Sequence, residues 1–85
     1  MRIFSYTLRN TLGIHSSIAS QLSAETRKYQ SRVTVRKGTR KAATMHISAL
    51  NGIDARCGDM ITVTVDGPDE IAAAEELELF FHRYM

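Results

Sequence analysis

The stretch Gly13-Ile14-His15-Ser16-Ser17-Ile18-Ala19 places a glycine and a histidine directly before what the pattern predicts to be an amphipathic helix. Small or apolar residues at positions 18, 19 and 22 recur at the spacing of one buried helix face. Ser16 and Ser17 are both of a type that caps helix N-termini, so the helix is expected to begin there. His15 is therefore expected just outside the first helical turn.

The start of this predicted helix is suited to binding an anion. Backbone N–H groups of a first turn have no partner within the helix, and the helix dipole favours negative charge there. A phosphoryl group on the His15 imidazole would meet several donors without any cationic side chain. The same dipole opposes a positive charge on the ring, which leaves a nitrogen lone pair free. The alternative is a histidine that merely occupies a helix start, and these residues alone leave both interpretations open.

Composition narrows the class of protein. The chain has 85 residues, enough for one domain with its own core. A hydrophobic fraction of 44% and a charged fraction of 24% are those of an ordinary globular protein, and the net charge of +2 is weak evidence for a nucleic-acid partner. The lone cysteine, Cys57, excludes an internal disulfide and suggests a reducing compartment. With no long apolar run and no signal-peptide pattern, a cytoplasmic protein without a membrane segment is expected.

Hydropathy patterns predict seven elements. Four segments alternate between apolar and polar residues, as strands with one buried face do, and the clearest is 60–66. The predicted strands are 2–8, 31–37, 40–44 and 60–66, the long helices are 16–28 and 70–83, and a short helix lies within 47–53. The order β-α-β-β-α-β-α predicts the α+β class, as an open-faced β-sandwich in which three helices cover one face of a four-stranded antiparallel sheet.

Several details of these elements are also predicted. Asp69 is expected to cap the last helix, Asn51-Gly52 to end the short helix, and Gly38-Thr39 to form a hairpin turn. The buried stripe of the last helix is expected to be Ile71, Ala74, Leu77, Phe81 and Tyr84.

Basic residues concentrate on and beside the predicted hairpin. We expect them to form a solvated sheet face whose charges discourage edge pairing. They are Arg32, Arg36, Lys37, Arg40 and Lys41. A nucleic-acid patch is the less favoured alternative, because no aromatic residue lies among them to stack on bases.

With its element order, its length and Gly13-Ile14-His15, the chain resembles the histidine-containing phosphocarrier protein (HPr) family of the bacterial sugar phosphotransferase system. The resemblance covers nearly the whole chain and implies a single HPr-like domain over residues 1–85. The matching positions are Gly13, Ile14, His15, Ala19, Leu22, Lys28, Tyr29, Val33, Gly58, Ile61, Thr62, Val63, Gly67, Asp69 and Glu70.

The resemblance implies a carrier that relays a phosphoryl group from enzyme I to an enzyme IIA, rather than a free-standing enzyme. His15 stands at the acceptor position, where the family is phosphorylated on Nδ1, and the backbone N–H groups of Ser16, Ser17 and Ile18 would hold the phosphate. The residues at the implied docking surface for partners are Ser16, Ser17, Ser20, Gln21, His46, Ile47, Ser48, Asn51 and Arg56. A monomer without cofactor or metal is expected, since the histidines and the cysteine lack metal-ligand spacing.

Three positions depart from the family pattern. Ser17 and Ile18 replace an arginine and a proline, and losing a charge-assisted contact to phosphate costs about 1.5–3 kcal/mol. Arg9 and Arg56 are candidate substitute cations. His46 replaces the serine that a regulatory kinase modifies in Gram-positive members, so that regulation is not expected here. These losses motivate an alternative function, a divergent regulatory or protein-binding module with weak or no phosphotransfer.

Overall fold

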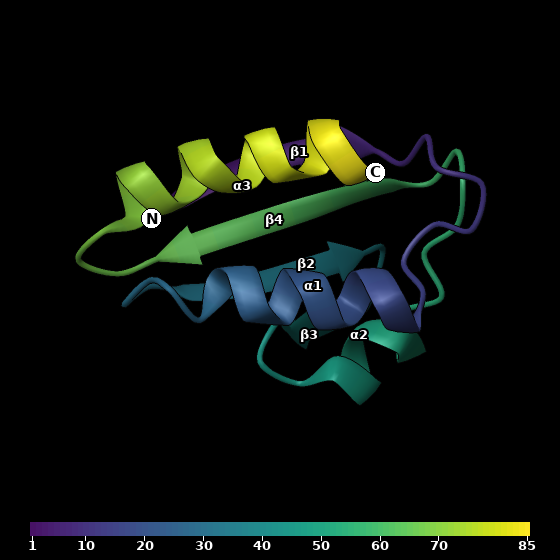
Figure 1. Cartoon of the computed structure of the whole chain (residues 1–85), viewed down its shortest axis with the longest axis horizontal. Helices are drawn as coiled ribbons and strands as arrows, with labels where there is room; N and C mark the ends of the chain where they lie inside the picture. The colour runs from purple at the N-terminus through teal and green to yellow at the C-terminus, as the bar shows by residue number, and fades with distance from the viewer.

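The computed structural model describes residues 1–85 and contains seven elements in the predicted order (Figure 1). They are β1 (Arg2–Thr7), α1 (Ser16–Thr26), β2 (Arg32–Lys37), β3 (Arg40–Ala43), α2 (Ile47–Gly52), β4 (Met60–Asp66) and α3 (Glu70–Tyr84). The predicted α+β class, with a four-stranded antiparallel sheet and three helices, is confirmed. None of the helices has the length and apolar character needed to cross a bilayer.

The strands lie in the order β1-β4-β2-β3, and every neighbouring pair is antiparallel. Val63 of β4 lies opposite Phe4 of β1 and Val35 of β2, so three apolar residues meet across the centre of the sheet. Because side chains alternate along a strand, Thr62 and Thr64 occupy the other face. β4 therefore holds the two halves of the sheet together.

The helices cover the apolar face of the sheet and leave the other face open. α3 packs on β1 and β4, α2 packs on β3, and α1 contacts both other helices. Figure 1 shows α1 and α3 running side by side over the sheet. The predicted inward residues of β2 and β4 are at most 3% exposed; they are Val33, Val35, Ile61, Val63 and Val65. The predicted stripe of α1 is also confirmed, with Ile18, Ala19, Leu22 and Thr26 buried.

The predicted stripe of α3 is wrong at both of its ends. Ile71 and Tyr84 are 55% and 44% exposed, whereas Phe80 is buried. The buried residues are Ala73, Ala74, Leu77, Phe80 and Phe81. The Phe81 ring makes edge contacts with the rings of Phe4 and Tyr6, at centroid distances of 5.7 and 5.6 Å. These aromatic contacts orient the helix so that Phe80 also turns inward, towards α1.

Several element ends differ from the predictions by one or two residues. α1 stops at Thr26, two residues early, and its C-cap is Arg27. Gly52 is helical, and the left-handed residue after α2 is Asp54, with φ 58°. β1 stops at Thr7, one residue before its predicted end, although the Leu8 N–H still donates to the Asp59 carbonyl at 2.9 Å, in line with the β1–β4 register.

The hairpin between β2 and β3 turns at the predicted Gly38-Thr39, with Lys37 opposite Arg40. Four of the five hairpin cations are exposed as predicted: Arg32, Arg36, Arg40 and Lys41. Lys37 differs, because it is half-buried and its Nζ lies 2.8 Å from Asp59 Oδ2. The hydrogen bond from Lys37 is the main reason that the pKa of the Asp59 carboxyl is lowered. Lys37 therefore ties the hairpin to the loop before β4.

Candidate functional site

His15 lies at the junction between the β1–α1 loop and α1. It is the N-cap residue, with an extended backbone (φ −123°, ψ 178°), and its carbonyl accepts the first helical bond from the Ala19 N–H at 2.8 Å. The prediction that a serine caps the helix is wrong, because Ser16 already has helical geometry and leads α1. His15 is half-buried and follows the buried Ile14. His15 therefore lies at the N-terminus of α1.

The first turn of α1 presents unused hydrogen-bond donors. The backbone N–H groups of Ser16, Ser17 and Ile18 have no acceptor, and no side chain caps this helix. No acidic residue lies in the first turn to neutralise the positive end of the dipole. Ser16 and Ser17 are exposed, whereas the Ile18 side chain is buried beneath them. The geometry is that of an anion-binding helix start beside an imidazole.

The loop before His15 is held by the loop that follows α2. The Ile14 N–H donates to the Ala55 carbonyl at 2.9 Å. Gly13 has φ +63°, and a Cβ built on it would lie 2.2 Å from that same carbonyl oxygen. Only glycine fits both the left-handed backbone and the close approach. Figure 1 shows these two loops meeting at the end of the molecule that also holds the C-terminus.

Neither of the candidate substitute cations contacts His15. Arg56 pairs with Asp54, Nε to Oδ1 at 3.0 Å, and its hydrogen bond is the main reason that the pKa of the Asp54 carboxyl is lowered. Arg9 lies over the Tyr6 ring, and its Nη2 is 3.5 Å from His82 Nδ1. The site therefore consists of the His15 imidazole and the uncharged backbone N–H groups of the first turn of α1, without a cationic side chain.

The residues assigned by resemblance to the docking surface lie on two neighbouring helices and one loop. α1 and α2 pack against each other. Ser20 and Gln21 are exposed on α1, as Ser48 and Asn51 are on α2. The exposed residues outside the helices are His46, the N-cap of α2, and Arg56. Ile47 is half-buried and packs against the core. The structure thus gathers these positions from separate parts of the chain.

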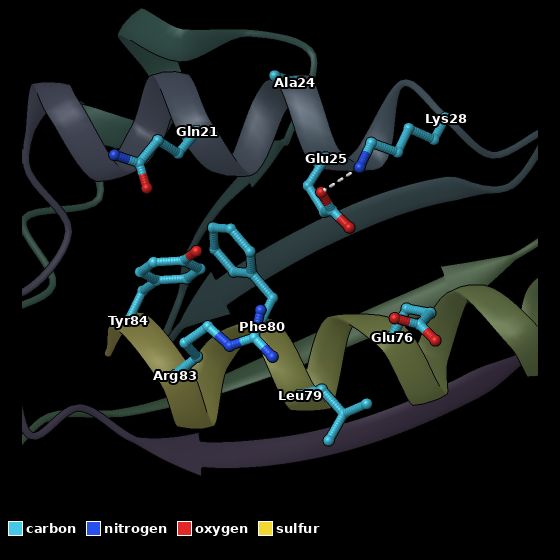
Figure 2. A pocket seen from close by; sticks show the side chains of 9 residues that line it. All are labelled: Gln21, Ala24, Glu25, Lys28, Glu76, Leu79, Phe80, Arg83 and Tyr84. Atoms are coloured by element: carbon cyan, nitrogen blue, oxygen red, sulfur yellow. Dashed lines mark ion pairs between the residues drawn. The ribbon is translucent and has the colours of Figure 1, made fainter.

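Figure 2 shows a hollow of about 470 Å³ between α1 and α3, lined by Phe80, Tyr84 and charged residues. An ion pair joins Lys28 Nζ to Glu25 Oε2 at 2.9 Å on its α1 side. No histidine lines this hollow, so it offers no imidazole as an acceptor for a phosphoryl group. Sequence reasoning did not find this hollow, because its shape depends on the inward turn of Phe80.

Comparison with known proteins agrees with this fold. A family model described as "PTS HPr component phosphorylation site" matches residues 4–83. A phosphocarrier protein HPr from Lysinibacillus sphaericus is 34% identical over 77 residues, covering 91% of this chain and 88% of the relative. One from Xylella fastidiosa is 33% identical over 79 residues, covering 92% and 89%.

Solved structures show the same fold. The crystal structure of HPr-C-His from Thermoanaerobacter tengcongensis has a TM-score of 0.90 at 21% identity, covering 96% of this chain and 92% of that one. An HPr from Bacillus anthracis has a TM-score of 0.86 at 19% identity, covering 94% and 95%.

The chain belongs to the HPr family of phosphocarrier proteins. Its function is that of a phosphocarrier in the phosphoenolpyruvate-dependent sugar phosphotransferase system. Membership implies interaction with enzyme I and enzyme IIA of that system in general. The matches do not favour the alternative of a binding module without phosphotransfer.

Proposed function

We propose that His15 is the residue that carries the phosphoryl group. The observation that carries this proposal is an extended N-cap histidine placed directly before three backbone N–H groups that have no acceptor. These donors, from Ser16, Ser17 and Ile18, hold the phosphate oxygens. Family resemblance makes Nδ1 the acceptor nitrogen.

The transfer exchanges one phosphorus–nitrogen bond for another. A lone pair of the His15 ring attacks the phosphorus of a phosphohistidine on enzyme I. The new bond to His15 forms as the old bond breaks, and the leaving imidazole keeps the electron pair. An acceptor histidine on enzyme IIA removes the group by the same exchange. The helix start stabilises the charge on the transferred group at each step.

The docking surface for both partners is formed by the exposed residues around His15 on α1, α2 and the loop after α2. It comprises Ser16, Ser17, Ser20, Gln21, His46, Ile47, Ser48, Asn51 and Arg56. Apolar area at Ile47 lies among hydroxyl and amide groups, an arrangement suited to a transient interface with a polar rim. One surface therefore serves donor and acceptor in turn.

The chain acts as a single domain over residues 1–85, as a monomer, in the cytoplasm, and without nucleic acid as a partner. One cluster of 21 buried residues supports the single domain. The exposed thiol of Cys57 suits a reducing compartment. The large exposed apolar residues are distributed over β1, β4, α3 and several loops, as is normal for monomers.

The test is incubation with enzyme I and phosphoenolpyruvate, followed by intact mass measurement under alkaline conditions. We expect a gain of one phosphate that is lost in acid and is absent in His15→Ala. The matched control is His82→Ala, which removes an exposed imidazole outside the docking surface and is expected to keep the label; His46→Ala is expected to be labelled more slowly but to the same final extent. Label that persists in His15→Ala and disappears in a control variant would move the acceptor. No label with enzymes I from several sources would favour the binding-module alternative.

A further inference from the structure

A second hollow, of about 420 Å³, lies at the β3 edge of the sheet, beside the N-cap residue of α2. Two cations, one hydroxyl and one imidazole line it, from Arg32, Lys41, Thr34 and His46. Its other lining residues are Ala42, Ala43 and Met45, so no carboxylate borders it. The polar groups come from β2, β3 and the N-cap of α2, three segments that the fold brings together.

The two cations at this hollow have no ion-pair partner within the chain. Lys28, Lys37 and Arg56 each form an ion pair, whereas Arg32 and Lys41 form none. Asp66 lies opposite Arg32 in the β2–β4 register, but it pairs with the N-terminal amine at 3.9 Å.

The strand register brings positively charged side chains close to one another. Lys41 lies directly opposite Arg36 on adjacent strands, and like charges in that position destabilise a sheet. Arg32 and Arg36 occupy alternate positions of β2, and therefore project from the same open face. The buried Val33 and Val35 between them point to the core. Neither Arg36 nor Lys41 forms an ion pair within the chain. An anion bound on this face would relieve their repulsion.

The chemistry of the lining selects the ligand class. A guanidinium, an ammonium and a hydroxyl are donors that together suit the oxygens of a phosphoryl group. The volume is that of a site for a small molecule. No aromatic ring other than the His46 imidazole lines the hollow, which argues against stacking of nucleic-acid bases.

We infer that this hollow is a second anion site, separate from His15, which binds a small molecule carrying one or more phosphoryl groups through Arg32, Thr34, Lys41 and His46. The site does not include His15, and only His46 is shared between it and the proposed docking surface. A bound anion would lie beside the residue that starts α2.

The test is a titration with pyrophosphate at constant ionic strength, followed by the backbone amide signals of the ¹⁵N-labelled protein. We expect saturable shifts at residues 32–34 and 41–46. Lys41→Gln and Arg32→Gln should each weaken binding about three- to tenfold. The matched control is Arg40→Gln, which removes the same charge from the neighbouring residue, outside the lining. It should change the affinity less than about twofold.

Other outcomes would overturn the inference. Shifts that rise without saturating, or that weaken equally in Arg40→Gln, would show diffuse attraction to a positive surface. Shifts confined to residues 16–18 would place the anion at the start of α1 instead. Binding of single-stranded RNA at residues 32–46 with no response to pyrophosphate would mark a nucleic-acid surface. His15→Ala should leave the pyrophosphate affinity unchanged. The titration therefore tests the second anion site separately from the proposal that His15 carries the phosphoryl group.

Discussion

The backbone N–H of Ile14 donates to the carbonyl oxygen of Ala55 at 2.9 Å, which fixes the residue before His15 to the loop between α2 and β4. Both residues are buried, at 5% and 1% exposure, so the bond is shielded from water. The position of the histidine therefore depends on a segment some forty residues away in the sequence.

Gly13→Ala should disrupt this contact. The new Cβ would lie 2.2 Å from the Ala55 oxygen on a backbone with φ +63°, so both a clash and strain result. We expect a loss of about 3 kcal/mol or more in the free energy of unfolding, together with slower phosphotransfer. Denaturant unfolding measures the first and labelling by enzyme I the second. Gly38→Ala is the control, because its φ is +60° but nothing lies within 4 Å, and it should cost about 1–2 kcal/mol. Equal losses in the two variants would show that the Ala55 contact has no effect.

Ser17→Arg should raise the rate of phosphotransfer. Ser17 is exposed in the first turn of α1, where a guanidinium can reach a phosphoryl group on His15. We expect a gain of about ten- to a hundredfold, measured by quenched-flow labelling. Ser20→Arg adds the same charge one turn further along the exposed side of α1 and should have a smaller effect. A flat or reduced rate in Ser17→Arg would contradict the role given to the missing cation.

Thr26→Val should destabilise the fold through a buried pair of hydroxyls. The Thr44 hydroxyl donates to Thr26 Oγ1 at 2.8 Å, and Thr26 donates to the Ser23 carbonyl at 3.0 Å. The single variant leaves the Thr44 hydroxyl without its acceptor, at a cost of about 1–3 kcal/mol. In the double variant Thr26→Val/Thr44→Val we expect a total loss below the sum of the two single losses, as measured by chemical denaturation. Strict additivity would mean that the two hydroxyls do not interact.

Asp69 should make stability sensitive to acid. Hydrogen bonds from the Ser31 hydroxyl and the Gln30 N–H hold the pKa of its carboxyl below the usual 3.8. A lowered pKa in the folded state stabilises the protein above pH 3.8, and this contribution disappears as the pH falls through the lowered value. Asp69→Asn should therefore be less stable at pH 7, and the difference should shrink towards pH 2.

The measurement is the denaturant midpoint of each variant between pH 2 and pH 7. Asp66→Asn is the control, because that carboxylate accepts no side-chain or backbone hydrogen bond and its one ion pair, with the N-terminal amine, is 3.9 Å long. A difference between wild type and Asp69→Asn that stays constant with pH would exclude the titration of Asp69 as its cause.

Much of the fold could be predicted because its strands alternate cleanly. The pattern of residues 60–66 assigns each side chain to one face, and the structure follows it. The stripe of α3 could not be predicted, because adjacent apolar residues at Phe80 and Phe81 fit more than one helix face. Contacts with Phe4 and Tyr6, distant in sequence, decide the orientation.

The candidate site could be predicted only where a local sequence pattern defines it. His15 before an apolar stripe is a local pattern, so its place at the start of a helix was visible in the sequence. The approach of Ala55 to Gly13 was not, because no periodicity links two loops separated by a sheet and a helix. α2 ends at Gly52, as predicted, but the left-handed residue that follows is Asp54 rather than a glycine.

The central place of β4 has a consequence for how the protein is made. Both β1 and β2 hydrogen-bond to β4, so neither pair can form before residues 60–66 leave the ribosome. Only the local hairpin of β2 and β3 can close earlier. The loop carrying Ala55 is anchored to the sheet by this same late strand. A nascent chain therefore cannot display a finished phosphoryl acceptor before β4 has been made, and partners meet the folded histidine only after that point.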